Sequence, residues 1–285
     1  MVTMSEVRFG YRRQAPLFDA LDFSVKPGGI VGLLGKNGAG KTTLLKLGTG
    51  LLFPHGGQAF LFGSPAEQRR PEVLARVAYV PEQFDVPGQR LREYVSGLSA
   101  YYPAFNAQAM DRYLERFEIY ENRRLTQMSF GQQKKVLLSF ALATGAELVV
   151  LDEPTNGLDI PSKQVFRQVV AEAADDQRAL VISTHQVRDV ESLIDPIVIL
   201  DGGTVVFEAS LEAIQNGVSM RRFESSQAAK TAGALAEQSQ LGSTVALVPD
   251  TDLGEPLGSE IDLELLFQAA VTQGPELRRV CGGAA

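Results

Sequence analysis

The order of apolar and polar positions along the chain predicts an α/β protein. Short apolar runs between glycine, proline or polar residues are typical of strands, and apolar residues that recur every three or four positions are typical of helices. By these patterns we expect strands at residues 2–9, 21–25, 30–34, 58–62, 76–80, 148–151 and 179–182. Helices are expected at residues 41–47, within 91–117, at 134–143 and at 162–173. Strands that alternate with helices indicate a parallel sheet, and we expect a small antiparallel sheet before it.

The pattern changes toward the C-terminus. Residues 197–200 and 204–207 are typical of a hairpin with a glycine turn. Beyond about residue 210 the composition shifts toward Ser, Ala, Gln and Gly, although a strand at 244–248 and a helix at 261–270 are still expected. We therefore predict a main domain over residues 1–218 and a small accessory segment over residues 219–285.

Composition narrows the class of protein. The chain has 285 residues, 45% of them hydrophobic, which is enough for a sizeable core. The net charge of −7 argues against a general nucleic-acid binder. The single cysteine, Cys281, cannot form an internal disulfide, so we expect a reducing compartment. Since no stretch approaches the roughly 18 apolar residues of a membrane span, we expect a soluble chain that reaches a membrane only through a partner.

The strongest chemical signal is an eight-residue run between the strand at 30–34 and the helix at 41–47: Gly35, Lys36, Asn37, Gly38, Ala39, Gly40, Lys41 and Thr42. In the pattern G-x-x-x-x-G-K-[ST] the glycines let backbone N–H groups face a phosphate, and the helix N-terminus adds unpaired donors. Lys41 is expected to reach the outer phosphates, and Thr42 to offer its hydroxyl to Mg²⁺. A plain glycine turn would not require Lys-Thr after the glycines. We therefore expect the chain to bind a nucleoside triphosphate.

A second signal is the pair of acids that ends the apolar strand at 148–151. Asp152 is placed to help hold Mg²⁺, because the carboxyl ends of parallel strands gather around a ligand. Glu153 is the natural candidate to polarise an attacking water. The alternative is that the two acids only cap the following helix.

Three further candidates each have a structural alternative. Tyr11 has an aromatic face that could stack on adenine, but the sequence of this stretch by itself favours a surface tyrosine. Ser129 with Gln132 fits a capping box at the start of a helix. His185 ends a strand, where it could donate to a γ-phosphate or serve only a structural role.

Taken together, these residues resemble the nucleotide-binding subunit of an ATP-binding cassette (ABC) transporter over residues 2–214. The resemblance depends on their order: a phosphate loop, Gln83 at a strand end, a helical insertion, Ser-x-Gly-Gln, Asp-Glu and then a histidine. It implies a P-loop NTPase (RecA-like) core with an N-terminal antiparallel β subdomain and a helical signature subdomain. The residues after 218 would be a small C-terminal appendage.

The resemblance also implies roles for individual residues. Tyr11 would stack on adenine, Thr43 would join the ATP-binding set, and Gln83 would touch Mg²⁺ and the attacking water. Asp159 would contact the opposite subunit, and His185 would sense the γ-phosphate. The signature that completes the partner's ATP site would be Ser129, Phe130, Gly131 and Gln132. Here Met128 and Phe130 depart from the usual Leu-Ser-Gly-Gly-Gln, and we expect the Phe130 ring at the edge of the dimer interface.

These expectations define a function. The chain would bind ATP and Mg²⁺, hydrolyse ATP as a head-to-tail dimer with a second nucleotide-binding subunit, in the simplest case a homodimer, and power a separate membrane-spanning permease. We expect export and a cytoplasmic location at the inner face of the cell membrane, with no nucleic-acid partner. The alternatives are a soluble ABC-type ATPase, as in translation or DNA repair, and a nucleotide-dependent regulator not coupled to transport.

Overall fold

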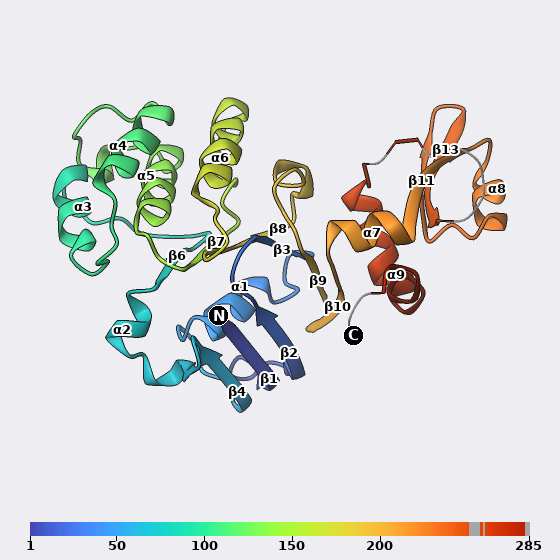
Figure 1. The fold of residues 1–285 in the computed structure, drawn as a ribbon, viewed down its shortest axis with the longest axis horizontal. Helices are drawn as coiled ribbons and strands as arrows, with labels where there is room; N and C mark the ends of the chain where they lie inside the picture. Colours follow the sequence, from blue (N-terminus) through green and yellow to red (C-terminus); the bar gives the residue numbers. More distant parts are fainter. Residues whose placement is uncertain (251–256, 259, 283–285) are drawn as a thin grey trace. The chain divides into compact units, whose positions relative to one another are not determined.

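The computed structural model describes residues 1–250, 257–258 and 260–282, which form two compact units (Figure 1). The first unit comprises Met1–Val31 and Lys41–Thr184, and the second comprises Gly32–Gly40 and the described residues from His185 onward. Strand β3 (Ile30–Leu34) therefore begins in the first unit and ends in the second.

The first unit opens with an antiparallel sheet in the order β2-β1-β4-β5. Its strands are β1 (Val2–Phe9), β2 (Phe18–Val25), β4 (Gly56–Leu61) and β5 (Ser64–Pro65). Buried and exposed residues alternate along most of β1, as expected for a sheet with one face on a core. The predicted antiparallel subdomain is thus confirmed.

Three parallel strands of the first unit carry the acidic strand end. In the order β8-β7-β6 they are β6 (Val77–Val80), β7 (Leu148–Asp152) and β8 (Ala179–Thr184). Every residue of β7 and β8 is buried, which explains their continuous apolar sequences. Helix α1 (Lys41–Gly48) begins at the lysine of the glycine-rich run.

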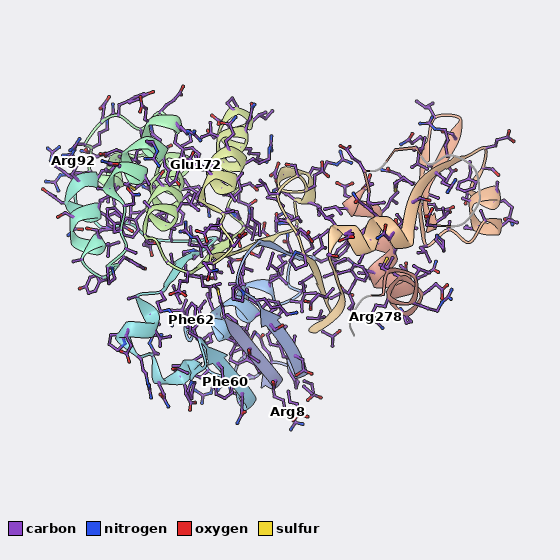
Figure 2. All side chains as sticks on the ribbon, in the orientation of Figure 1. Arg8, Phe60, Phe62, Arg92, Glu172 and Arg278 are labelled. Atoms are coloured by element: carbon purple, nitrogen blue, oxygen red, sulfur yellow. The ribbon has the colours of Figure 1, made fainter. Side chains whose placement is uncertain are left out.

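The remaining helices of this unit lie mainly between β6 and β8 in the chain (Figure 1). They are η1 (Ala66–Gln68), α2 (Pro71–Leu74), α3 (Leu91–Ser99), α4 (Ala107–Arg116), η2 (Leu125–Gln127), α5 (Phe130–Ala143) and α6 (Ile160–Ala173). Phe140 of α5 packs against the rings of Tyr94, Tyr102 and Phe105, which fixes the helical insertion on α5. Figure 2 labels Glu172 of α6, which forms ion pairs with two arginines of α4.

The second unit contains the predicted hairpin and a C-terminal sheet. Its elements are η3 (Val187–Asp189), β9 (Ile197–Asp201), β10 (Thr204–Ala209), α7 (Leu211–Gly217), β11 (Val218–Phe223), α8 (Ser226–Thr231), β12 (Ala236–Gln240), β13 (Ser243–Pro249) and α9 (Leu263–Cys281). Residues Gly32, Leu33 and Leu34 pair in parallel with β9. Strands β11, β13 and β12 form an antiparallel sheet. Arg278 of α9, labelled in Figure 2, donates to the carbonyl of Val206 in β10.

The predicted α/β class is confirmed, and the elements expected through residue 207 are present with small changes of boundary. The sequence patterns did not predict α7, β11, α8 and β12, and they predicted only the first half of α9. The division at residue 218, where α7 has just ended and β11 begins, stays a prediction. Among the described residues no helix is both long and apolar enough to cross a membrane.

Candidate nucleotide-binding site

The glycine-rich run adopts a backbone that requires glycine at two positions. Gly38 has a φ of +81° and Gly40 a φ of +105°, both in the region that side-chain-bearing residues rarely adopt. The run leads directly into α1, whose first two residues are Lys41 and Thr42. The sequence thus brings a cation and a hydroxyl to a helix N-terminus, where unpaired N–H groups and the helix dipole favour a phosphate.

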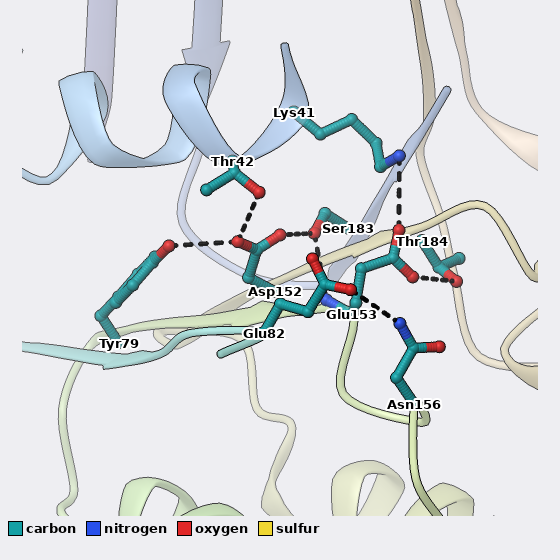
Figure 3. Close-up of polar contacts among 9 residues, drawn as sticks. All are labelled: Lys41, Thr42, Tyr79, Glu82, Asp152, Glu153, Asn156, Ser183 and Thr184. Carbon is teal, nitrogen blue, oxygen red and sulfur yellow. Dashed lines mark hydrogen bonds and ion pairs between the residues drawn. The ribbon is translucent and has the colours of Figure 1, made fainter. Parts of the chain in front are cut away.

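Asp152 ends β7 in a fully buried position and accepts hydrogen bonds from three hydroxyl groups (Figure 3). Its Oδ2 accepts from Thr42 Oγ1 at 2.7 Å and from the Tyr79 hydroxyl at 3.2 Å. Its Oδ1 accepts from the Ser183 hydroxyl. Burial, together with the charge of Asp152, raises the pKa of Tyr79, so this phenol stays a donor at neutral pH. The arrangement brings the Thr42 hydroxyl and the Asp152 carboxylate together, as predicted for two residues that would bind one metal ion.

Glu153 is held at the same strand end by its backbone and by both carboxylate oxygens. Its φ of +45° is uncommon for a residue with a side chain, and its N–H donates to the Ser183 carbonyl at 3.0 Å. Thr184 Oγ1 donates to Glu153 Oε2 at 3.2 Å, and Lys41 Nζ lies 3.3 Å from Glu153 Oε1 (Figure 3). The Lys41 and Glu153 side chains are only 7% and 5% exposed, so the ion pair is shielded from solvent.

The segment after β6 approaches the same acids. Glu82 Oε1 accepts a hydrogen bond from Asn156 Nδ2 at 3.1 Å, which joins this segment to the turn that follows Glu153 (Figure 3). Lys134 of α5 is fully buried and donates to the carbonyls of Pro81 and Glu82, each at 3.2 Å. Burial lowers the pKa of Lys134 to about 8, and nearby carboxylates oppose the shift. Gln83 follows Glu82 directly and is exposed.

Tyr11 is positioned by contacts within the antiparallel sheet and α1. Its hydroxyl lies 3.0 Å from Thr43 Oγ1, and its ring meets Phe9 edge to face at 5.2 Å. The Tyr11 side chain is 43% exposed. The exposed part of the side chain therefore lies close to α1, where an aromatic ring can stack on a planar group.

The Ser129–Gln132 segment forms the predicted capping box. Ser129 Oγ accepts from the Gln132 N–H at 3.2 Å, and Gln132 Oε1 accepts from the Ser129 N–H at 3.0 Å. A Cβ at Gly131 would lie 2.8 Å from the Gly157 carbonyl oxygen, so glycine is required there by close packing. The Phe130 ring is 47% exposed and stacks on the Phe84 ring at a centroid distance of 5.0 Å.

Asp159 and His185 each lie at the edge of an element. Asp159 caps α6, where its Oδ1 accepts from the Ser162 N–H at 2.9 Å, and hydrogen bonds from Ser162 lower the pKa of this exposed carboxyl. His185 follows the last residue of β8 and is exposed. The contact of Asp159 with another subunit stays a prediction.

Six residues of this site were not predicted: Tyr79, Glu82, Lys134, Asn156, Ser183 and Thr184. Ser183 and Thr184 end a parallel strand beside the acid pair, so strand-end position was a usable signal for them. Tyr79 sits one residue before the end of β6, and its aromatic character suggested only packing. Nothing in the local pattern distinguished Lys134 from a solvent-facing lysine.

A glycine-rich loop leading into Lys-Thr, with these two residues bonded to an Asp-Glu strand end, defines a P-loop nucleoside-triphosphate-binding protein. A family model described as ABC transporter matches residues 18–156. The "Nod factor export ATP-binding protein I" of Burkholderia lata is 32% identical over 216 residues, covering 73% of this chain and 70% of that protein. The chain therefore belongs to the ABC transporter family, among its ATP-binding subunits.

Two further comparisons agree with this assignment. The protein of the same name from Cupriavidus metallidurans is 32% identical over 197 residues, covering 67% of this chain. This chain spans 65% of the length of that relative. A solved structure titled "Structure of ATP binding subunit of ABC transporter" superposes with a TM-score of 0.68 at 25% identity, covering 75% of this chain and 92% of the other. The predicted family and fold are confirmed.

Proposed function

We propose that the chain binds Mg²⁺ and ATP, hydrolyses ATP as a homodimer, and powers a separate membrane-spanning permease. The observation that carries this proposal is the direct contact between the start of α1 and the acidic strand end. Thr42 bonds to Asp152 at 2.7 Å and Lys41 pairs with Glu153 at 3.3 Å (Figure 3). These are the four side chains that phosphate binding, metal binding and water activation require.

The donor set at Thr42 and Asp152 fits Mg²⁺. A hydroxyl and a carboxylate oxygen are hard ligands of the kind that Mg²⁺ takes beside substrate phosphates and waters. Within the described residues no group of three His, Cys, Asp or Glu side chains could hold a metal ion. We expect Thr42, Asp152 and Gln83 to hold the ion with phosphate oxygens, where it would neutralise phosphate charge.

The Lys41–Glu153 ion pair suggests how ATP prepares the general base. The β- and γ-phosphates offer Lys41 a stronger partner than a single carboxylate, because several charged oxygens can accept from one ammonium group. Lys41 would then leave Glu153 Oε1, while Thr184 keeps its hydrogen bond to Oε2. The freed oxygen can accept a proton from the attacking water as that water adds to the γ-phosphorus and ADP leaves.

The remaining predicted residues take roles around this centre. The half-exposed ring of Tyr11, beside Thr43, would stack on adenine. His185, next in the chain after Thr184, would contact the γ-phosphate. The signature, Ser129 to Gln132, would complete the ATP site of a second copy, because Ser129 lies at the N-terminus of α5. Asp159 would contact that copy.

The helical region offers the surface for the permease. A groove of about 530 Å³ between α3 and α4 is lined by the apolar side chains Leu91, Val95, Phe105, Met110, Leu114 and Tyr120. Arg92, labelled in Figure 2, and several acids border it. We place the permease contact here and around Gln83, at the inner face of the cell membrane. The names of the relatives support export, and they do not favour a role unrelated to transport.

Replacing the proposed base tests the function. We expect Glu153→Gln to lower kcat for ATP hydrolysis at least ~100-fold, because the amide cannot accept the water proton. ATP affinity, measured by calorimetry, should be retained. Lys41→Ala should instead weaken ATP binding, and Glu67→Gln, at an exposed acid of η1, should behave as the unmodified chain. Near-normal turnover by Glu153→Gln would overturn the assignment.

A further inference from the structure

The Phe130 ring packs inside its own subunit, between two segments that border the acid pair. It is nearly parallel to the Phe84 ring, with an interplanar angle of 12° and a centroid distance of 5.0 Å. The ring also lies against Gly157, where an added Cβ would lie 2.7 Å from Phe130 Cδ1 and Cε1. Phe84 follows Gln83 directly, and Gly157 lies in the turn after Glu153.

Lys134 contacts the same two aromatic rings and the segment after β6. It lies one helical turn after Phe130 on α5, so both side chains are on one face of the helix. Its buried ammonium group lies 5.4 Å from the Phe84 ring centroid and 5.9 Å from the Phe130 ring centroid. The same group donates to the carbonyls of Pro81 and Glu82. The start of α5 is thus tied to the segment after β6 by stacking and by hydrogen bonds.

A second link closes the cluster between the two segments. Asn156, the residue before Gly157, donates a hydrogen bond at 3.1 Å to Glu82, the residue before Gln83. Both segments therefore contact each other and also contact the first turn of α5. A glycine at position 130 has no side chain to stack, so it would remove the contacts with Phe84 and Gly157 and leave the Lys134 and Asn156 links.

We propose that Phe130 is a positioning residue that links the signature to Gln83 and to the turn after Glu153 within one subunit. The inference rests on the proposed ATPase function and adds a mechanism to it. Contact of the signature with ATP moves Phe130, and the ring transmits that movement to Phe84 and Gly157. Gln83 and Glu153 are then held at the geometry that hydrolysis requires. This places the ring's main partner in its own subunit instead of across the dimer interface.

A double-mutant cycle on ATP hydrolysis tests the link. We expect Phe84→Ala and Phe130→Ala each to lower kcat about threefold to tenfold, with KM for ATP changed less than about twofold. The double variant should be no worse than the poorer single variant, since both remove one interaction. Phe130→Tyr keeps the ring and should restore kcat. Phe53→Ala, at an aromatic of similar exposure (46%), is the matched control.

Fluorescence provides a readout independent of turnover. The chain has no tryptophan, so Phe84→Trp introduces a single emitter at the stacked position. Adding Phe130→Ala should expose the indole and raise its quenching by iodide, whereas Phe130→Tyr should keep it protected. Both variants should show the far-UV circular dichroism of the unmodified chain.

Two results would overturn the proposal. One is a double variant whose loss in kcat equals the product of the two single losses, together with iodide quenching of Phe84→Trp that Phe130→Ala does not change. The other is a Phe130→Ala variant that alters only the lifetime of the ATP-bound Glu153→Gln dimer, which would show that the ring acts across the interface. If the unmodified chain hydrolyses no ATP, the proposed function fails instead, and the quenching experiment still shows whether the stack exists.

Discussion

Because Lys134 is buried, its ammonium group loses its proton at a lower pH than that of a free lysine. Its pKa is lowered to about 8 in the folded chain, against about 10.4 for a free lysine. Below pH 8 both states bind the proton, so the contribution of Lys134 is constant. Between pH 8 and 10 the unfolded chain binds more protons, so this contribution to stability rises with pH. The negative charges of Asp152, Glu82 and Glu153 lie near the ammonium group and oppose this lowering of its pKa.

The prediction is a pH-dependent difference between two chains. The free energy of unfolding of the unmodified chain, minus that of Lys134→Met, should rise from pH 8 to pH 10 in urea titrations. Lys135→Met, at the neighbouring and less buried position, should show no such slope. A difference that stays constant from pH 7 to pH 10 would show that Lys134 titrates normally.

At the scale of single residues, the sequence predicted the site residues whose place in a motif is fixed by the chemistry of phosphate and metal binding. Lys41 and Thr42 must follow the glycines, and Asp152 must end a strand, so local order alone brought them into one site. Tyr79 belongs to the site because its hydroxyl faces Asp152, and Lys134 because its ammonium group faces Phe84. Both contacts form only when the sheet and α5 pack together. Such contacts join positions far apart in the sequence, and no local pattern encodes them.

At the scale of elements, the start of α5 serves two purposes that a substitution can separate. Ser129 caps the helix through the Gln132 N–H and is also the proposed partner of a γ-phosphate. Aspartate caps helices about as well as serine, whereas alanine costs about 1 kcal/mol. We expect Ser129→Asp to unfold in urea with a free energy within about 0.5 kcal/mol of the unmodified chain.

The Ser129→Asp variant should lose the proposed contact with the γ-phosphate. In the Glu153→Gln background, Ser129→Asp should weaken ATP-dependent dimerisation at least ~10-fold in sedimentation experiments, because its carboxylate repels the phosphate. Ser129→Ala should lose stability and weaken dimerisation less. Normal dimerisation of the aspartate variant would leave Ser129 with the capping role alone.

Elements with strong periodicity were predicted, and those formed by pairing were not. Strand β12 (Ala236–Gln240) is polar and mostly exposed, and it is a strand because its backbone pairs with β13. Helix α9 was expected to end near residue 270, but it continues past a non-helical Gln273 and Pro275. The helical geometry breaks at Gln273, and Pro275 lies in the first turn of the segment that follows, where proline's missing N–H costs no hydrogen bond. Leu277 of that second segment is buried.

At the scale of the whole molecule, the proposed head-to-tail dimer has a consequence that neither subunit shows alone. Each ATP site would combine the Lys41 side of one copy with the signature of the other. A Lys41→Ala copy keeps its signature, and a Ser129→Asp copy keeps its phosphate loop. Each variant by itself forms only incomplete sites, so each should be nearly inactive.

Mixing the two variants should restore activity. Half of the dimers in an equimolar mixture combine one copy of each, and such a dimer has one complete site and one with both lesions. If the sites work independently, turnover should recover to about a quarter of that of the unmodified chain. The matched control mixes Lys41→Ala with Glu153→Gln, whose lesions lie on the same side of the site, so no complete site forms. Recovery in neither mixture, with mixed dimers verified by tagged copies, would contradict the head-to-tail arrangement.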